Sequence, residues 1–258
     1  MRFLLKIRRF LPGRPAAGLF SGQTERSNLQ CHLFGSDRCS KEKVTVVRKN
    51  DDGGIVVLDF ETSGMSPEQG DRAIEIGAVL IRNGAIVDHF QSLMNSGVRV
   101  NGFIEDYTGI TNDMLRTAPV AAEVMTAFSA FIADYPLVAH NAAFDRRFLD
   151  AELQRIRKKR RQDFACSLLV ARRLYPEAPN HKLETLIRYK GLSVGTFHRA
   201  LADSEMTARL WLRMRSDLQS LHGINPASFA LMQHLATIKK SRIGSYLEQL
   251  SKSPDPRF

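Results

Sequence analysis

The 258-residue sequence is poor in cysteine and tryptophan and has no long hydrophobic stretch. Its three cysteines, Cys31, Cys39 and Cys166, are too few and too odd in number for a disulfide framework, which favours a reducing compartment. Cys31, His32 and Cys39 lack any recognised zinc-site spacing, so we interpret them as incidental. No apolar run approaches the roughly 18 residues that span a membrane. These absences exclude disulfide-rich, membrane-spanning and collagen-like classes.

Negative charge is scarce at the start of the chain. Residues 1–24 contain no acidic residue, and residues 1–50 hold 11 Lys or Arg against 3 Asp or Glu. Residues 51–258 are nearly balanced, with 26 basic and 24 acidic side chains. Because the basic segment also lacks periodicity, we expect residues 1–50 to be a largely disordered extension.

Three interpretations of this extension stay open. It can act as an electrostatic or partner-docking arm, be removed as a transit peptide, or be passive. Residues 1–11 can also form an amphipathic helix that attaches to an anionic membrane surface. We expect a cytoplasmic location, with a mitochondrial one as the alternative if the extension is a transit peptide. The formal charge of +10 suits a polyanionic partner without proving one.

Strand patterns begin at residue 54. Residues 55–60 form a short β-branched apolar run that is typical of a buried central strand. The hairpin signal Asn83-Gly84 separates two further strands, at 72–82 and 85–94, and this arrangement predicts an antiparallel meander. Short buried strands are also expected at residues 137–139 and 164–165.

Helical spacing dominates the rest of the chain. Apolar side chains recur three or four residues apart, as in helices that cover a sheet. With the strands, this pattern predicts an α/β fold in which a mixed five-stranded sheet, an antiparallel meander followed by parallel strands, is flanked by helices. Helices are expected at residues 119–133, 142–154, 167–174, 182–189, 200–215 and 226–239.

Four carboxylates and one histidine form the candidate chemistry. Asp59 and Glu61 lie two residues apart on the first strand, so their side chains share one face about 7 Å apart. Two such acids repel each other unless a cation lies between them. Asp145 lies in the first turn of a helix, and His198 precedes Asp203 by five residues at the start of another.

Each of these residues also has an ordinary interpretation. Asp59 and Glu61 can be a plain acidic strand end, and Asp145 can simply complement the helix dipole. His198 can be a polar surface residue at a loop–helix junction. Together, however, oxygen-only ligands suit Mg²⁺ or Mn²⁺, and two such ions about 4 Å apart clamp a phosphoryl displacement. A neutral histidine can take a proton from the attacking water.

The order of these residues resembles a known family. Residues 57–64 (Val-Leu-Asp-Phe-Glu-Thr-Ser-Gly), 140–145 (His-Asn-Ala-Ala-Phe-Asp) and 198–203 (His-Arg-Ala-Leu-Ala-Asp) resemble the three exonuclease motifs of the DEDDh 3′→5′ exonucleases. Residues 107–111 and 183–186 resemble the connecting segments of that family. This DnaQ-like family has a ribonuclease-H-like fold, and the nearest likeness is to the proofreading subunits of bacterial replicative DNA polymerases.

The resemblance implies a role for each residue of the site. Asp59, Glu61 and Asp203 would hold the tighter of two divalent cations, Mg²⁺ or Mn²⁺. Asp59 would also bridge to the second ion, which Asp145 would bind directly or through water. His198 would act as the general base.

The resemblance also implies residues that hold the terminal nucleotide. Met65 can alternatively pack within its loop, Asn141 can be a helix N-cap, and Phe144 can be a core residue. The nucleotide-binding residues implied are Thr62, Ser63, Gly64, Met65, Asn141 and Phe144.

Two further features have alternative interpretations. The basic run at residues 155–161 can be a solvated helix end or can grip a phosphate backbone. Trp211 is expected in a core or interface rather than as a base-stacking platform.

These observations predict a division into residues 1–50 (basic, disordered N-terminal extension), 51–216 (DEDDh exonuclease domain) and 217–258 (C-terminal helical extension and tail). The expected function is metal-dependent 3′→5′ hydrolysis of nucleic acid, DNA favoured, with release of nucleoside 5′-monophosphates. Expected partners are nucleic-acid 3′ ends and a DNA polymerase subunit. The alternatives are an exonuclease for RNA or oligoribonucleotides and a noncatalytic docking module of a polymerase or repair complex.

Overall fold

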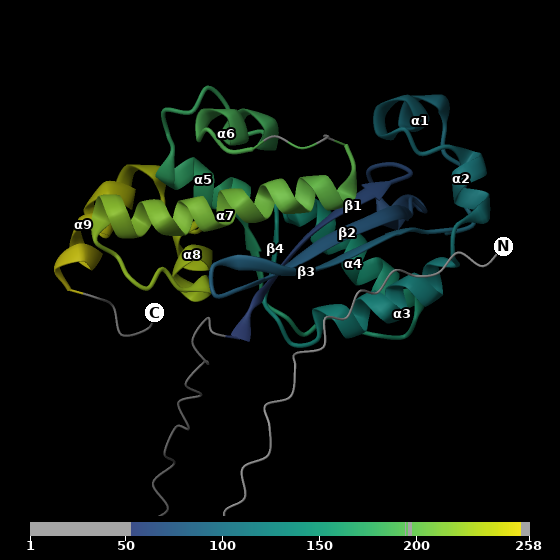
Figure 1. Ribbon diagram of the computed structural model, residues 1–258, viewed down its shortest axis with the longest axis horizontal. Coiled ribbons are helices and arrows are strands. Elements are labelled where there is room, and N and C mark those ends of the chain that lie inside the picture. Colours follow the sequence, from purple (N-terminus) through teal and green to yellow (C-terminus); the bar gives the residue numbers. More distant parts are fainter. Residues whose placement is uncertain (1–52, 194, 196–197, 254–258) are drawn as a thin grey trace, which may run out of the picture. The chain divides into compact units, whose positions relative to one another are not determined.

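The computed structural model describes residues 53–193, 195 and 198–253, all of which belong to one unit, residues 49–258 (Figure 1). The expectations for residues 1–50, including the amphipathic helix at 1–11, lie outside the described residues. In the described part, no helix combines the length and apolar character needed to cross a membrane.

The sheet has five strands in the order β3-β2-β1-β4-β5. β1 pairs antiparallel with β2, and β2 antiparallel with β3, whereas β4 pairs parallel with both β1 and β5. The predicted meander followed by parallel strands is therefore confirmed, with the first strand at the centre. The strands are β1 (Ile55–Thr62), β2 (Ala73–Arg82), β3 (Ala85–Leu93), β4 (Leu137–Ala139) and β5 (Phe164–Cys166).

The Asn83-Gly84 turn between β2 and β3 behaves as its sequence predicts. Asn83 and Gly84 have φ values of 50° and 75°, the left-handed backbone that a tight two-residue hairpin requires.

The helices follow the predicted pattern with three additions. α1, α2 and α9 were not predicted, because each is short and the sequence shows no long apolar stripe there. Side-chain caps support α1 and α2, since Asn101 accepts from the backbone N–H of Ile104 and Thr111 from that of Met114. The α-helices are α1 (Gly102–Thr108), α2 (Asn112–Thr117), α3 (Ala121–Ile132), α4 (Ala143–Arg155), α5 (Ser167–Leu174), α6 (Leu183–Tyr189), α7 (Ala200–His222), α8 (Phe229–Leu235) and α9 (Ile243–Lys252).

Two helix ends differ from the sequence prediction. α7 continues past residue 215 to His222 and stops where Gly223 takes a left-handed φ of 66°. α8 covers only the middle of the predicted 226–239 helix, because Ser228 caps its start by accepting from the N–H of Leu231.

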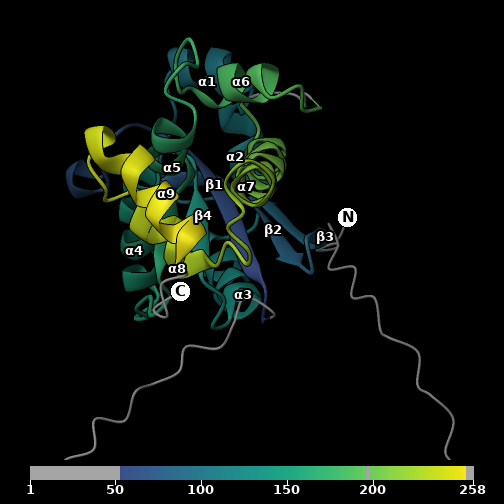
Figure 2. The same cartoon turned by 90° about the vertical axis from the view of Figure 1, so that its left-hand side faces the viewer.

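Side-chain alternation along β1 divides the core into two layers. Ile55 and Val57 pack with residues of α5 to α9 on one face of the sheet. Val56, Leu58 and Phe60 pack with α3 and α4 on the other face. In Figures 1 and 2, α7 accordingly lies above the sheet and α3 below it.

The C-terminal helices share the core of the α7 layer. Trp211 of α7 is fully buried, and its ring lies 6.2 Å from that of Phe229 in α8. Leu247 and Leu250 of α9 belong to the same cluster. Trp211 is thus a core residue, as expected from its neighbours in the sequence.

Candidate active site

Strand alternation decides where the first two acids point. Val57 faces the α7 layer, so Asp59 and Glu61 lie on that face as well. Asp203 lies in the first turn of α7, and carboxylate oxygens of the three acids lie within 4.8 Å of one another. The structure therefore brings together three of the four carboxylates that the sequence singled out.

The start of α7 is held against β2 at close range. Gly77 has no side chain, and a Cβ at this position would lie 2.1 Å from the backbone carbon of Ala200. Ser204 donates its hydroxyl hydrogen to the Gly77 carbonyl at 2.9 Å. This direct backbone contact fixes the register of α7 on the sheet, and with it the position of Asp203.

A buried acid on β2 supports the same helix end. Glu75 is fully buried and accepts hydrogen bonds from the backbone N–H of Ala200 at 3.2 Å and from Arg199 at 2.9 Å. Its Cα is paired with that of Glu61 across the β1–β2 ladder. Sequence reasoning missed Glu75, although a single acid inside an apolar strand was the available signal.

Asp145 approaches β1 from the opposite direction. It lies in the first turn of α4, is 2% exposed, and accepts a hydrogen bond from the backbone N–H of Phe60 at 3.2 Å. This bond occurs where β4 no longer pairs with β1, since that ladder covers only Val56 and Val57. Asp145 is outside the cluster of three acids but close enough to raise the pKa of Asp59.

Burial raises the pKa of all four carboxyl groups, and neighbouring acids add to this effect at Asp59, Glu61 and Asp203. Burial, then the neighbouring Asp145 and Glu61, holds the pKa of Asp59 well above its ordinary value. Burial is also the largest cause of raising the pKa of Glu61 to about 8. It raises those of Asp145 and Asp203 to about 7 and about 6. The negative charge of these four carboxylates is therefore poorly balanced by the protein alone.

One oxygen of the cluster has no hydrogen-bond donor. Asp203 Oδ2 accepts from the backbone N–H of His198 at 3.1 Å, but its buried Oδ1 has no partner among the described residues. A buried, unpaired carboxylate oxygen beside two other acids fits a divalent cation, since such ions take oxygen ligands and offset the repulsion.

His198 lies at the rim of the same site. Its side chain is exposed, and its backbone has a left-handed φ of 62°, uncommon for a residue with a Cβ. The N–H bond to Asp203 holds this conformation. The imidazole ring contacts that of Tyr107, with 4.1 Å between ring centroids. Tyr107 was noted in the sequence only as part of a connecting segment.

A cleft of about 790 Å³ joins these groups. It is bounded by the β1 end, α1, the start of α7, and α5 and α6, and Figure 1 shows α1 and α6 on the same upper side of the molecule. Its lining residues are Asp59, Tyr107, His140, Asn141, Leu168, Arg172, Asn180, His181, Lys182, Leu183, Glu184, His198 and Asp203.

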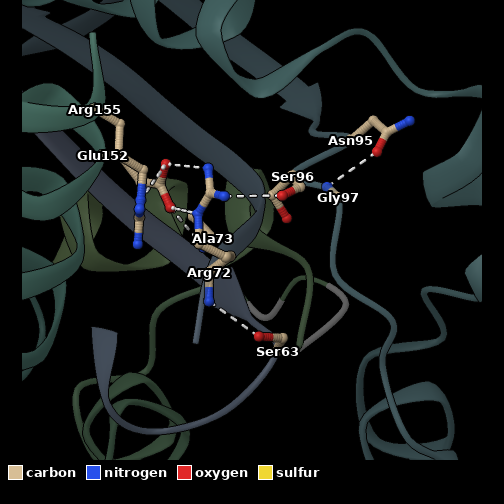
Figure 3. Close-up of polar contacts among 8 residues, drawn as sticks. All are labelled: Ser63, Arg72, Ala73, Asn95, Ser96, Gly97, Glu152 and Arg155. Atoms are coloured by element: carbon tan, nitrogen blue, oxygen red, sulfur yellow. Dashed lines mark hydrogen bonds and ion pairs between the residues drawn. The ribbon is translucent and has the colours of Figure 1, made fainter. Parts of the chain in front are cut away.

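The loop after Glu61 is rigidly supported. Thr62 donates its hydroxyl hydrogen to the Gly64 carbonyl at 2.6 Å, and Ser63 Oγ accepts from the Arg72 backbone N–H at 3.0 Å. A Cβ on Gly64 would lie 2.4 Å from the Asp71 carboxyl group, so a larger residue here would displace the side chain that accepts from the Ser66 backbone N–H. Figure 3 shows that the Arg72 side chain, in turn, is clamped by Glu152 of α4 and the Ser96 carbonyl.

The nucleotide-binding residues that the sequence implied fall into different surroundings. Met65 is 73% exposed, so the interpretation that it packs within its loop is wrong. Asn141 lines the cleft but is not an N-cap, because its φ of 68° is left-handed and Ala142 precedes the helix without a side-chain cap. Phe144 is partly buried against Phe148, with ring centroids 4.9 Å apart, as a core residue would be.

The basic run at residues 155–161 lies at the far end of α4 from Asp145. Arg155 lies ten positions after Asp145 in α4, which is about 15 Å along the helix at 1.5 Å per residue. Arg160 is paired with Asp150 at 2.8 Å, and none of the run lines the cleft. Within the described residues, this position fits the solvated helix end better than a phosphate grip at the cleft.

The acids lie at the end of the central strand, at the start of a neighbouring helix and on a helix that covers the sheet. This arrangement on a mixed sheet defines a class of metal-dependent nuclease. The exonuclease family model (RNase_T) matches residues 56–211, which is more than half of the chain. The chain therefore belongs to this exonuclease family. Its acids and histidine follow the DEDDh order, which places it in the 3′→5′ class.

The named relatives are much longer than the region that this chain matches. The DNA polymerase III PolC-type of Caldanaerobacter subterraneus subsp. tengcongensis is 34% identical over 191 residues, 73% of this chain and 14% of that protein. The DNA polymerase III PolC-type of Bacillus subtilis is 39% identical over 164 residues, 63% of this chain and 11% of that protein. The chain thus spans a small part of each.

Solved structures show the same fold. Exonuclease X in complex with 5′ overhanging duplex DNA has a TM-score of 0.56 and 24% identity, over 70% of this chain and 99% of that one. The nuclease domain of 3′hExo, a DEDDh family member bound to rAMP, has a TM-score of 0.55 and 24% identity, over 64% of this chain and 92% of that one. The predicted ribonuclease-H-like fold is confirmed.

Proposed function

We propose that this chain hydrolyses phosphodiester bonds at the 3′ ends of nucleic acid, with DNA favoured, and releases nucleoside 5′-monophosphates. The observation that carries the proposal is the convergence of Asp59, Glu61 and Asp203, whose oxygens lie within 4.8 Å of one another beside a cleft that Asp59, Asp203 and His198 line. Clustered carboxylates that can hold divalent cations, beside a histidine that can accept a proton, are the parts that phosphodiester hydrolysis needs.

The acids fit two divalent cations, Mg²⁺ or Mn²⁺. Asp59, Glu61 and Asp203 would hold one ion, with the unpaired Asp203 Oδ1 among the ligands. Asp59 and the nearby Asp145 would hold the other. When bound, such ions stabilise the charge that develops on the phosphate and ease deprotonation of water.

The remaining roles belong to side chains around the cleft. A ring nitrogen of His198 would take the proton of the attacking water, because the imidazole is exposed at the rim while its backbone is tied to Asp203. The loop residues Thr62 to Met65 and Asn141 would hold the terminal nucleotide. The hydrogen bonds within the loop keep this contact surface in place.

DNA is the favoured polymer, and a DNA polymerase is the proposed partner. The support is that the named relatives are DNA polymerases and that Exonuclease X is described in complex with DNA. The DEDDh relative bound to rAMP keeps RNA as the competing substrate. The two polymers differ at the 2′-hydroxyl, so matched DNA and RNA strands distinguish them.

The test is a gel assay of 5′-labelled single-stranded DNA and RNA of matched sequence, with Mg²⁺, Mn²⁺ or EDTA. We expect a metal-dependent ladder that shortens from the 3′ end, faster on DNA, and absent for Asp203→Asn. Faster shortening of the RNA strand would show that RNA, not DNA, is the preferred substrate. If folded protein leaves both strands at full length in Mg²⁺ and in Mn²⁺, the proposal is overturned in favour of a noncatalytic docking module.

A further inference from the structure

The cleft extends well past the acids, onto the side formed by α5 and the α5–α6 connection. Arg172 and Lys182 line this side and are exposed. Among the described residues, neither side chain has a hydrogen-bond or ion-pair partner. Glu184, which also lines the cleft, is already paired with Arg188 at 2.9 Å. The cleft is thus lined both by the acids Asp59 and Asp203 and, on the α5–α6 side, by two uncompensated cations.

A buried histidine fixes the basic side to the sheet. His140 follows β4, and its Nε2–H donates to the carbonyl of His181 at 2.9 Å. Its Nδ1 lies 2.9 Å from the Oγ of Ser167, at the start of α5, and can accept from that hydroxyl. The ring is neutral near pH 7, because burial lowers the pKa of His140 to about 4. One side chain therefore ties α5 and the α5–α6 connection to the strand beside β1.

Local hydrogen bonds fix the backbone that carries Lys182. Asn180 Oδ1 accepts from the Lys182 backbone N–H at 2.9 Å. His181 Nε2 donates to the Tyr175 carbonyl at 3.0 Å. These hydrogen bonds hold the backbone of the α5–α6 connection in place, so the Lys182 side chain extends to the cleft from a fixed backbone position.

We propose that Arg172 and Lys182 bind the phosphates of the nucleotides that precede the cleaved one. The proposal rests on the function proposed above, because it assigns the part of the cleft lined by the acids to the 3′-terminal nucleotide. Arg offers a planar fork of donors to a phosphate, and Lys a compact charge, so both suit a backbone without reading its bases. The substrate class is then a strand of at least four nucleotides, or three with a 5′-phosphate, not a free dinucleotide.

The separation of charge also favours one placement of the strand in the cleft. A strand is repelled by the acids wherever cations do not neutralise them, and attracted by the basic side. The arrangement places the strand so that its 3′ end reaches the acids while its preceding phosphates stay on the α5–α6 side. Phosphate contacts of this kind position a strand and make binding salt-dependent.

The test pairs a change in the protein with a change in the strand. An oligothymidylate with a 5′ fluorophore is compared with the same strand carrying uncharged methylphosphonates at the second and third linkages from its 3′ end. Binding to the full chain is measured by fluorescence anisotropy in Ca²⁺ and in EDTA. The doubly substituted R172Q/K182Q chain is compared with K159Q/R161Q, which removes the same two charges from exposed positions outside the cleft.

The proposal predicts a specific pattern of binding affinities. The wild type and K159Q/R161Q should bind the all-phosphate strand about tenfold more tightly than the methylphosphonate strand. R172Q/K182Q should bind both strands within about twofold of each other, and the single substitutions should lie between. Equal discrimination by all proteins would overturn the proposal, as would equal loss of discrimination in the two double variants.

Failure of the proposed function gives a different result. If the chain binds strands but does not cut them, the gel assay with Mg²⁺ or Mn²⁺ is negative while the binding pattern above is unchanged. If R172Q/K182Q melts at a lower temperature than the wild type, the singly substituted chains R172Q and K182Q decide the matter, each expected to lose about threefold in discrimination.

Discussion

Glu61 illustrates how the candidate site sets single-residue chemistry. Its carboxyl group shares a β1 face with Asp59 and lies near Asp203 and Glu75, so burial and these acids raise its pKa to about 8. Arg199, the nearby cation, opposes this effect but is itself engaged by Glu75. The site holds more negative charge than its own cations balance, as expected of a site that takes metal ions.

This raised pKa predicts a pH-dependent stability. In the unfolded chain Glu61 titrates near its ordinary value, about 4.5, while in the folded chain it titrates at about 8. Between these values the folded protein binds a proton that the unfolded chain does not, so raising the pH through this window lowers the free energy of unfolding. In EDTA, the wild type should therefore lose stability relative to Glu61→Gln between pH 5 and pH 8.

Urea unfolding of both proteins at the two pH values measures this difference. Mn²⁺ should restore the wild type at pH 8 more than at pH 5, because metal binding requires ionised carboxylates. A wild type that gains stability relative to Glu61→Gln on going to pH 8 in EDTA would contradict this account of the site.

Some site residues could be predicted from the sequence and others could not. The predictable ones lie in short motifs at strand ends and helix starts: Asp59, Glu61, Asp145, His198 and Asp203. Their roles remain predictions. Arg172 and Lys182 reach the cleft only through the packing of α5 and the α5–α6 connection, which no short spacing encodes. The N-cap prediction for Asn141 failed because an asparagine also tolerates left-handed backbone.

At the scale of elements, α7 depends on a close approach to β2. The prediction concerns Gly77→Ala. The added Cβ would lie 2.1 Å from the Ala200 backbone, so α7 must move away from the sheet. Overpacking of this kind costs about 1–3 kcal/mol, and displacement of Asp203 should lower kcat about 100-fold.

Urea unfolding and steady-state rates measure the two effects of Gly77→Ala. The matched control is Gly244→Ala in α9, where a Cβ meets no atom within 4 Å and the change should leave the rate unaltered. Equal rates for Gly77→Ala and the wild type would show that the α7 register does not position the site.

The link between the β1–β2 loop and α4 gives a second element-scale prediction. Arg72 Nε bonds Glu152, which is 2% exposed, at 2.7 Å (Figure 3). Arg72→Met leaves that buried carboxylate with Arg155 at 3.8 Å as its remaining ion-pair partner. We expect a loss of about 3 kcal/mol in the free energy of unfolding and a higher KM, because the loop that carries Ser63 loses its support.

Chemical denaturation compared with an exposed pair tests this assignment. Arg116→Met removes the partner of Asp113, where both side chains are at least 74% exposed, and should cost less than about 1 kcal/mol. Comparable losses from the two substitutions would show that the Arg72–Glu152 pair is not a structural clamp.

The elements themselves were more predictable than their ends. β1 to β3 follow from apolar alternation and the Asn83-Gly84 turn, both local signals. α1 and α2 were missed because their stability comes from side-chain caps and from packing on Ile74 rather than from a long apolar stripe. The end of α7 was misplaced because Leu218, beyond residue 215, is buried in the cluster that α8 and α9 share, whereas residues 219–221 are exposed and extend no apolar stripe.

At the scale of the whole molecule, the core extends beyond the family match. The match ends at residue 211, yet Trp211, Met214 and Leu218 of α7 pack with residues of α8 and α9. Removal of residues 226–258 would expose these side chains, each contributing about 1.5–3 kcal/mol by its burial. We expect the shortened chain to lose most of its stability, since domains of this size have about 5–15 kcal/mol.

Circular dichroism and tryptophan fluorescence during urea unfolding measure this loss. The control is removal of residues 254–258 alone, which leaves α8 and α9 complete. A chain without 226–258 that unfolds at the wild-type urea concentration would show that the C-terminal segment is an independent extension, as the sequence division at 216 and 217 proposed.

The most direct measurement of the central claim follows oxygen from water into the first product. A single-stranded DNA with a unique base at each end is digested in ¹⁸O-water with Mg²⁺ or Mn²⁺, and the products are identified by mass spectrometry. The first product should be the 3′-terminal nucleoside 5′-monophosphate carrying one ¹⁸O, and Asp59→Asn should form none. A first product from the 5′ end, a 3′-monophosphate or internally cut fragments would contradict the central claim.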